Sequence, residues 1–154
     1  MDRIFIRTKE DETLDIPLYD KVTVLTGDSA TGKTKMLGWL SACKSVSKEN
    51  PNEIVETSVN LEDITIITSE EMVKSLLKGE YYHKIIFIDR FMLWANTDLI
   101  EYIYNSENIY IILGHRNTSE ITSQDAVLGL RHDGKNYTCY QIYENGLFNP
   151  KDII

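Results

Sequence analysis

An eight-residue segment of small and polar residues, GDSATGKT at residues 27–34, limits what this 154-residue chain can fold into. Immediately before it, residues 22–25 form a short apolar run that predicts a buried strand. Immediately after it, apolar residues recur at three- and four-residue steps from Lys33 to Val46, which predicts a helix. The segment is therefore expected to connect a buried strand directly to a helix.

This segment has the pattern G-x-x-x-x-G-K-[ST], and each required position has a physical reason. Glycine at both Gly positions allows backbone angles and a close approach that a Cβ would block. The main-chain amides of the loop can then point at phosphate oxygens, with the amino terminus of the helix behind them. The lysine can reach the β- and γ-phosphates, and the final hydroxyl is a hard oxygen ligand for Mg²⁺. The expected nucleotide-binding residues are Gly27, Asp28, Ser29, Ala30, Thr31, Gly32, Lys33 and Thr34.

A second motif is a wholly apolar run, residues 85–88, that is followed by Asp89. Continuous apolar runs of this length are typical of strands buried on both faces of a parallel sheet. A carboxylate at the end of such a strand can hold Mg²⁺ through water. We therefore expect Thr34 and Asp89 to be the metal ligands, and the cofactors to be ATP or GTP with Mg²⁺.

On these two motifs the chain resembles the P-loop NTPase superfamily, with Walker A at residues 27–34 and Walker B at residues 85–89. The resemblance covers roughly residues 22–114. The strand pair expected before Val22 and the sequence GHR at residues 114–116 are similar to features of the ABC-type and AAA-type ATPases. By this resemblance, a residue that senses the γ-phosphate would stand at one of positions 115–117.

The sequence also departs from these families. ABC ATPases have a Glu directly after the Walker B Asp, and here that position is Arg90. The sequence contains no LSGGQ segment, and residues 47–83 are too few for an ABC helical subdomain. The resemblance is therefore to a minimal relative of the ABC and AAA ATPases.

The remaining segments predict an α/β protein. Further strands are expected at residues 3–8, 14–18, 64–67, 109–113, 126–131 and 137–143, further helices at 69–78 and 98–104, and a long loop at 45–60. Together with the resemblance, these segments predict a three-layer P-loop NTPase fold. It would have a mostly parallel sheet of four to five strands, with antiparallel hairpins at the amino- and carboxyl-terminal ends. A single nucleotide-binding domain is expected to span residues 1–154.

Hydrolysis of a nucleotide requires a group that orients the attacking water and positive charge on the γ-phosphate. Because Arg90 occupies the usual Glu position, the candidate catalytic residues are Glu70, at the end of a neighbouring strand as in RecA-like ATPases, and Arg116. Alternatives stay open at this point. Glu70 and Glu71 could instead complement a helix dipole after Ser69, and Arg90 could pair with a nearby acid or contact phosphate.

Three functions are consistent with these residues. The first is a nucleotide-dependent switch with weak or partner-stimulated hydrolysis, acting through a protein partner or a homo-oligomer. The second is a nucleotide-binding protein without catalysis, and the third is a small-molecule kinase. Whether the chain is an enzyme is left open.

Composition narrows the possible partners. The formal net charge is −8, from 24 acidic and 16 basic side chains, which disfavours nucleic acid because its affinity comes from Lys and Arg on phosphates. No apolar run approaches the ~20 residues of a membrane-spanning helix, and no signal peptide is apparent. Cys43 and Cys139 match no metal-binding spacing and are expected to be free thiols. A cytoplasmic protein is therefore expected.

Overall fold

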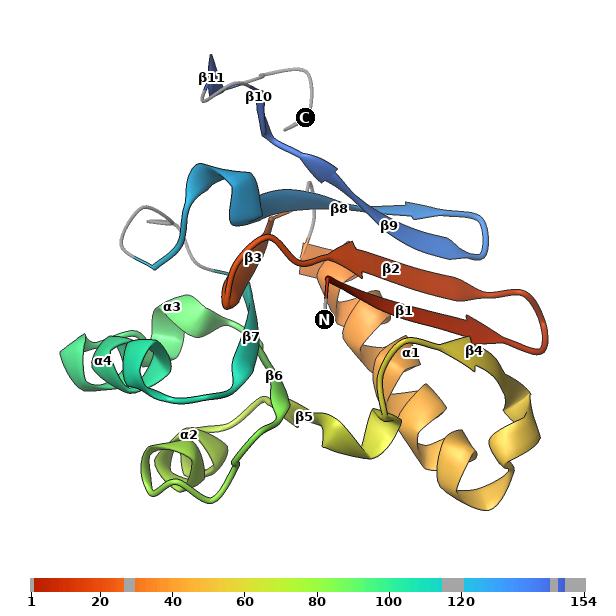
Figure 1. Cartoon of the computed structure of the whole chain (residues 1–154), viewed down its shortest axis with the longest axis horizontal. Helices are drawn as coiled ribbons and strands as arrows, with labels where there is room; N and C mark the ends of the chain where they lie inside the picture. The colour runs from red at the N-terminus through yellow and green to blue at the C-terminus, as the bar shows by residue number, and fades with distance from the viewer. Residues whose placement is uncertain (1, 27–29, 115–120, 145–146, 149–154) are drawn as a thin grey trace.

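The computed structural model describes residues 2–26, 30–114, 121–144 and 147–148 of the chain (Figure 1). Its main feature is a nine-stranded mixed sheet in the order β4-β1-β2-β9-β8-β3-β7-β6-β5. The strands are β1 (Arg3–Thr8), β2 (Thr13–Pro17), β3 (Val22–Thr26), β4 (Ile54–Thr57), β5 (Ile64–Ile67), β6 (Ile85–Ile88), β7 (Ile109–Leu113), β8 (Val127–Asp133) and β9 (Asn136–Gln141). A separate pair is formed by β10 (Tyr143–Glu144) and β11 (Leu147–Phe148). The helices are α1 (Ala30–Glu49), α2 (Glu70–Leu77), α3 (Phe91–Trp94) and α4 (Thr97–Asn105).

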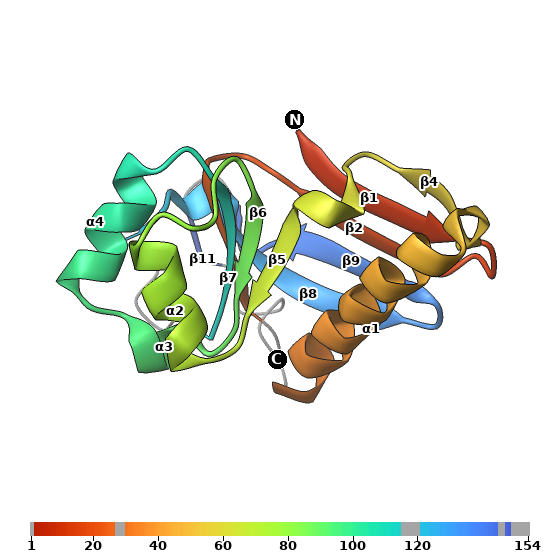
Figure 2. The ribbon, with the colours of Figure 1, turned by 90° about the horizontal axis from the view of Figure 1, so that it is seen from below.

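The predicted fold class, a three-layer P-loop NTPase fold with four to five mostly parallel strands, is wrong. The sheet has nine strands, and the hairpins are part of it rather than additions at its ends. Strands β8, β3, β7, β6 and β5 pair in parallel, whereas β1 pairs with β2 and β4, and β8 with β9, in antiparallel. A parallel pairing of β2 with β9 then joins the two hairpins. The result is one curled mixed sheet (Figure 2).

The concave side of this sheet is filled by α1 (Figure 2). Met36 and Leu40 of α1 are fully buried, in one cluster with Ile16 of β2 and Phe87 of β6. The side chain of Lys44 also donates a hydrogen bond from Nζ to the carbonyl of Ile64 in β5. Helix α1 thus packs against strands from both halves of the sheet order.

The other side of the parallel strands is covered by α2, α3 and α4, which lie together in Figure 1. A second buried cluster joins Val73 of α2, Phe91 of α3 and Leu99 of α4 to β6 and β7. The wholly apolar sequences of β6 and β7 follow from this arrangement, because both faces of these strands are buried. In the described part of the chain, no helix combines the length and hydrophobicity needed to cross a membrane.

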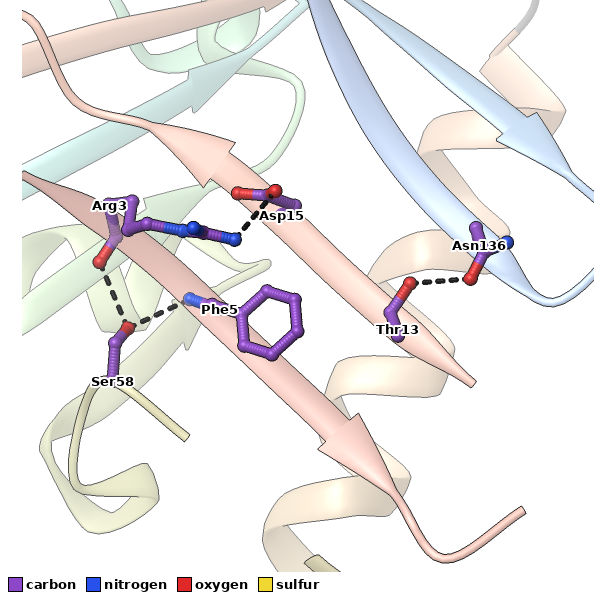
Figure 3. A network of polar contacts seen from close by, with 6 residues as sticks. All are labelled: Arg3, Phe5, Thr13, Asp15, Ser58 and Asn136. Carbon is purple, nitrogen blue, oxygen red and sulfur yellow. Dashed lines mark hydrogen bonds and ion pairs between the residues drawn. The ribbon is translucent and has the colours of Figure 1, made fainter. Parts of the chain in front are cut away.

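Polar side chains join the amino-terminal hairpin to its neighbours (Figure 3). The Thr13 hydroxyl donates to Asn136 Oδ1 at 2.6 Å, and these two residues form one of the two residue pairs that connect β2 to β9. Ser58 Oγ accepts from the amide of Phe5 at 2.8 Å and donates to the carbonyl of Arg3 at 2.9 Å. These side-chain contacts add to the backbone pairing of β1 with β2 and of β2 with β9.

Most of the predicted elements are confirmed, but the predicted loop at residues 45–60 is wrong in part. Helix α1 continues to Glu49, and β4 follows as an edge strand on β1. Three of the four β4 residues are exposed, so the segment lacks the apolar alternation by which strands are predicted. The predicted helix at 69–78 is confirmed as α2, and Ser69 caps it by accepting from the amide of Met72.

Candidate functional site

The carboxyl ends of four parallel strands lie at one edge of the sheet. Leu25 of β3 pairs with Leu113 of β7, and Ile88 of β6 pairs with Ile112 of β7. Strand β7 therefore lies between β3 and β6, and neighbouring strands are about 4.8 Å apart, so the ends of β3 and β6 lie roughly 10 Å apart. Asp89 directly follows β6 at this edge.

The predicted phosphate-binding segment lies partly outside the described residues. Gly27, Asp28 and Ser29 are not described, and Ala30 and Thr31 are described only as the first residues of α1. Gly32, Lys33 and Thr34 follow in the first turns of α1; Lys33 is half-buried and Thr34 is exposed. The predicted passage from a buried strand to a helix is thus confirmed on both sides of residues 27–29.

Asp89 is held by its main chain at the end of β6. Its amide donates to the carbonyl of Ile67 in β5 at 3.0 Å, and its own carbonyl accepts from Trp94 Nε1 at 2.9 Å. Its carboxylate accepts from the amide of Arg90 at 2.9 Å, and the side chain is 23% exposed. The carboxylate therefore has a fixed position and remains accessible at the edge of the sheet.

Arg90 makes the ion pair that the sequence left as one of two alternatives. Its Nε lies 3.8 Å from Asp89 Oδ2, and its Nη2 donates to the carbonyl of Thr68 at 2.9 Å. The backbone of Arg90 is left-handed, with φ 50° and ψ 46°, which is unfavourable for a residue with a Cβ. The side chain thus bridges the carboxyl ends of β5 and β6.

The backbone around Arg90 packs closely against the end of β7. Gly114 has φ 77°, and a Cβ added there would lie 3.1 Å from the Cα of Arg90. The carbonyl of Gly114 accepts from the amide of Met92 at 3.1 Å. A glycine is therefore required at this position, both for its left-handed backbone and for the close approach to Arg90.

Glu70 is the first residue of α2 and lies beyond the end of β5. Its carboxylate is 3.8 Å from Lys74 Nζ, one helical turn further on, and its side chain is 72% exposed. Glu71 is also in the first turn of α2, where negative charge is favoured by the helix dipole. This placement supports the helix-dipole alternative for both residues. The other predicted catalytic residue, Arg116, lies outside the described residues together with His115 and Asn117.

The hard oxygen donors of the site are the Thr34 hydroxyl and the Asp89 carboxylate. The described ranges contain no group of three or more His, Cys, Asp or Glu residues that could hold a metal ion. Mg²⁺ does not need such a group, because it usually keeps several waters and binds one or two protein oxygens together with substrate phosphates. The Thr34 hydroxyl and the Asp89 carboxylate are oxygen ligands of the kind that Mg²⁺ takes.

Two contacts of this site could not be predicted from the sequence. Trp94 binds the main-chain carbonyl of Asp89, and Arg90 binds the main-chain carbonyl of Thr68. Neither contact has a sequence pattern, because each depends on the turn of the chain between β6 and α3.

No protein-family model matches this sequence, and no curated protein matches it either.

Proposed function

We propose that the chain binds a nucleoside triphosphate, with ATP preferred, together with Mg²⁺, and acts as a nucleotide-dependent switch. The observation that carries the proposal is that Lys33 and Thr34 stand in the first turns of α1, after β3, at the edge of the sheet where Asp89 is held. The sequence GDSATGKT supplies the residue types that phosphate binding needs at this junction.

In this proposal each residue has a separate role. The ammonium group of Lys33 binds the β- and γ-phosphates, and the main-chain amides at the start of α1 bind phosphate oxygens. The Thr34 hydroxyl and the Asp89 carboxylate hold Mg²⁺, directly or through water. The metal, when bound, neutralises phosphate charge.

The contacts of Arg90 and Glu70 support slow turnover. Arg90 places a guanidinium, which cannot act as a base, next to the Asp89 carboxylate. Glu70 is paired with Lys74 and largely exposed. We therefore propose weak or partner-stimulated hydrolysis, and a binding protein without catalysis is the second candidate on the same contacts. A protein partner or a second copy would receive the output, in the cytoplasm, where the two free thiols of the described residues would stay reduced.

The test is titration calorimetry of the full chain with ATP and with GTP in the presence of Mg²⁺. Charge-assisted hydrogen bonds contribute about 1.5–3 kcal/mol each, so Lys33→Ala should weaken binding by about 10- to 100-fold. Lys35→Ala is the matched control, because Lys35 is an exposed lysine on the same helix. It should change the affinity by less than about twofold, as expected for a surface charge.

The release of phosphate from the nucleotide is then measured with the same protein. Slow release that Lys33→Ala abolishes supports the switch, and binding without release supports the non-catalytic protein. ADP that forms only after addition of a small acceptor would indicate a kinase. If the wild type gives no binding heat with either nucleotide, or if Lys33→Ala binds as well as the wild type, the proposal is refuted.

A further inference from the structure

A groove lies along the second half of α1, away from the candidate nucleotide site. It is bounded by the turn between β1 and β2, by α1 and by the start of β4, and its volume is about 180 Å³. Apolar or weakly polar side chains of α1 form its floor: Trp39, Cys43 and Val46. Three carboxylates stand around it: Glu10, Glu12 and Glu53.

The floor of the groove is continuous because its residues share one face of α1. Positions 39, 43 and 46 follow the three- and four-residue steps of a helix face. Trp39 is half-buried and its ring lies 5.7 Å from that of Tyr137, while Val46 is 39% exposed. Burial raises the pKa of the Cys43 thiol to about 12, with a further contribution from Glu12, so the thiol is neutral and adds no charge to the floor.

The three carboxylates have no ion-pair partner among the described residues. By contrast, Asp15 of β2 pairs with Arg3 of β1, and Glu56 of β4 pairs with Arg7 of β1. Near the groove, Lys135 Nζ instead donates to the main-chain carbonyl of Glu10 at 3.0 Å. Burial, and after it the negative charge of Glu12, raises the pKa of Tyr137, whose ring lies beside that of Trp39.

We propose that this groove binds a short basic segment of a partner protein. One apolar side chain of the segment would lie on the floor beside Trp39 and Val46, and Lys or Arg residues on either side would pair with Glu10, Glu12 and Glu53. The volume is slightly larger than the ~150 Å³ of a cavity that holds benzene, so it accommodates a single aromatic or branched aliphatic side chain. Charge complementarity selects a basic segment over an acidic one.

The proposal is independent of nucleotide binding. Lys33 and Val46 are separated by about 20 Å along the axis of α1 at 1.5 Å per residue. No residue of the groove belongs to the candidate phosphate site. If the groove binds no peptide, the proposal of nucleotide binding is unaffected, and the reverse also holds.

The first experiment selects peptides from a random heptapeptide phage library on the full chain. The library is first depleted on Ala42→Arg, because Ala42 is exposed on the groove side of α1 and an arginine there adds both bulk and positive charge. We expect the selected peptides to carry one aromatic or branched aliphatic residue with Lys or Arg on both sides. Selected peptides without basic residues, or no peptide that prefers the wild type to Ala42→Arg, would overturn the proposal.

The second experiment measures the affinity of the best peptide by fluorescence anisotropy. Exposed ion pairs contribute about 0.2–1 kcal/mol each, so the triple variant Glu10→Gln, Glu12→Gln and Glu53→Gln should weaken binding by about tenfold. The control is a second triple variant that removes three negative charges outside the groove: Glu71→Gln, Glu80→Gln and Glu101→Gln. It should bind within about twofold of the wild type.

Two measurements guard against a trivial loss of binding. Thermal unfolding by circular dichroism shows whether each variant is folded, and affinity of the wild type at rising NaCl tests the same charges without mutation. Affinity should fall steadily with salt, because exposed charge pairs are screened. An affinity that is insensitive to salt, or self-association of the wild type that Ala42→Arg abolishes, would contradict binding of a basic partner segment.

Discussion

Gly129 of β8 lies beneath the ring of Tyr140 on the neighbouring strand β9, and adding a methyl group there should destabilise the protein. The two residues are direct partners in the antiparallel pair. A Cβ on Gly129 would lie 2.2 Å from Cζ of Tyr140 and 2.6 Å from two further ring atoms. Since real Cβ atoms do not approach ring carbons so closely, Gly129→Ala must displace the ring, which also stacks against the Arg131 guanidinium at 4.5 Å.

The size of the effect follows from two opposing terms. Overpacking of a fitted contact costs about 1–3 kcal/mol, whereas replacing a strand glycine by alanine contributes about 0.5–1 kcal/mol. The net loss for Gly129→Ala is therefore about 1 kcal/mol, which lowers Tm by about 2–4 °C in a chain of this length. Urea unfolding followed by circular dichroism measures the loss directly.

A double-mutant cycle tests the reason for the loss. In a Tyr140→Ala background the obstacle is absent, so Gly129→Ala should be neutral or stabilising, giving a coupling energy of about 1.5–2 kcal/mol. Gly38→Ala is the control, because Gly38 is an exposed helical glycine with no atom within 4 Å of an added Cβ. That variant should gain up to about 1 kcal/mol. Equal effects of Gly129→Ala in both backgrounds would refute the role of the ring.

Four further predictions concern the cap of α2, the thiols (two predictions) and the ligand. Ser69→Ala should cost about 1 kcal/mol in urea unfolding, because the Ser69 hydroxyl accepts from the first turn of α2; an unchanged midpoint would argue against the cap. Burial raises the pKa of Cys43 and Cys139 to about 12. At pH 8 only about one native thiol in ten thousand is then ionised, so iodoacetamide should label them far more slowly than in urea. Stability should fall above about pH 9, because the unfolded thiols ionise while the folded ones keep their protons. Mg²⁺ and ATP at about 100 times Kd should stabilise the wild type by about 2.7 kcal/mol, seen as a rise in Tm that Lys33→Ala lacks.

Local elements of this fold are predictable because their signals lie within a few residues. The run at residues 85–88 is apolar throughout because both faces of β6 are buried. The hairpin expected at the carboxyl-terminal end is formed by β8 and β9, which turn at Gly134 with φ 61°. Ser69 begins α2 through a contact only three residues long. In each case the physical cause and the pattern occupy the same short segment.

The sheet as a whole could not be predicted, because its order depends on contacts between distant segments. Nothing in the sequence of β2 indicates that it pairs in parallel with β9, more than 100 residues later. The edge strand β4 has no apolar alternation because most of it faces solvent. At the candidate site, the placement of residues 32–34 at the start of a helix and of Asp89 after a buried strand could be predicted. The bridge from Arg90 to Thr68 could not, because it depends on how β5 lies beside β6.

The position of the β8–β9 hairpin has a consequence for how the chain acquires its structure. Strands β2 and β3 are consecutive along the chain, yet β9 and β8 lie between them in the sheet. During synthesis, the edges of β2 and β3 that later pair with β9 and β8 therefore stay unpaired until residues 127–141 leave the ribosome. Unpaired edges of this kind attract other chains, and pairings between distant segments form slowly. Early folding intermediates of this protein should accordingly depend on chaperones more than its modest length suggests.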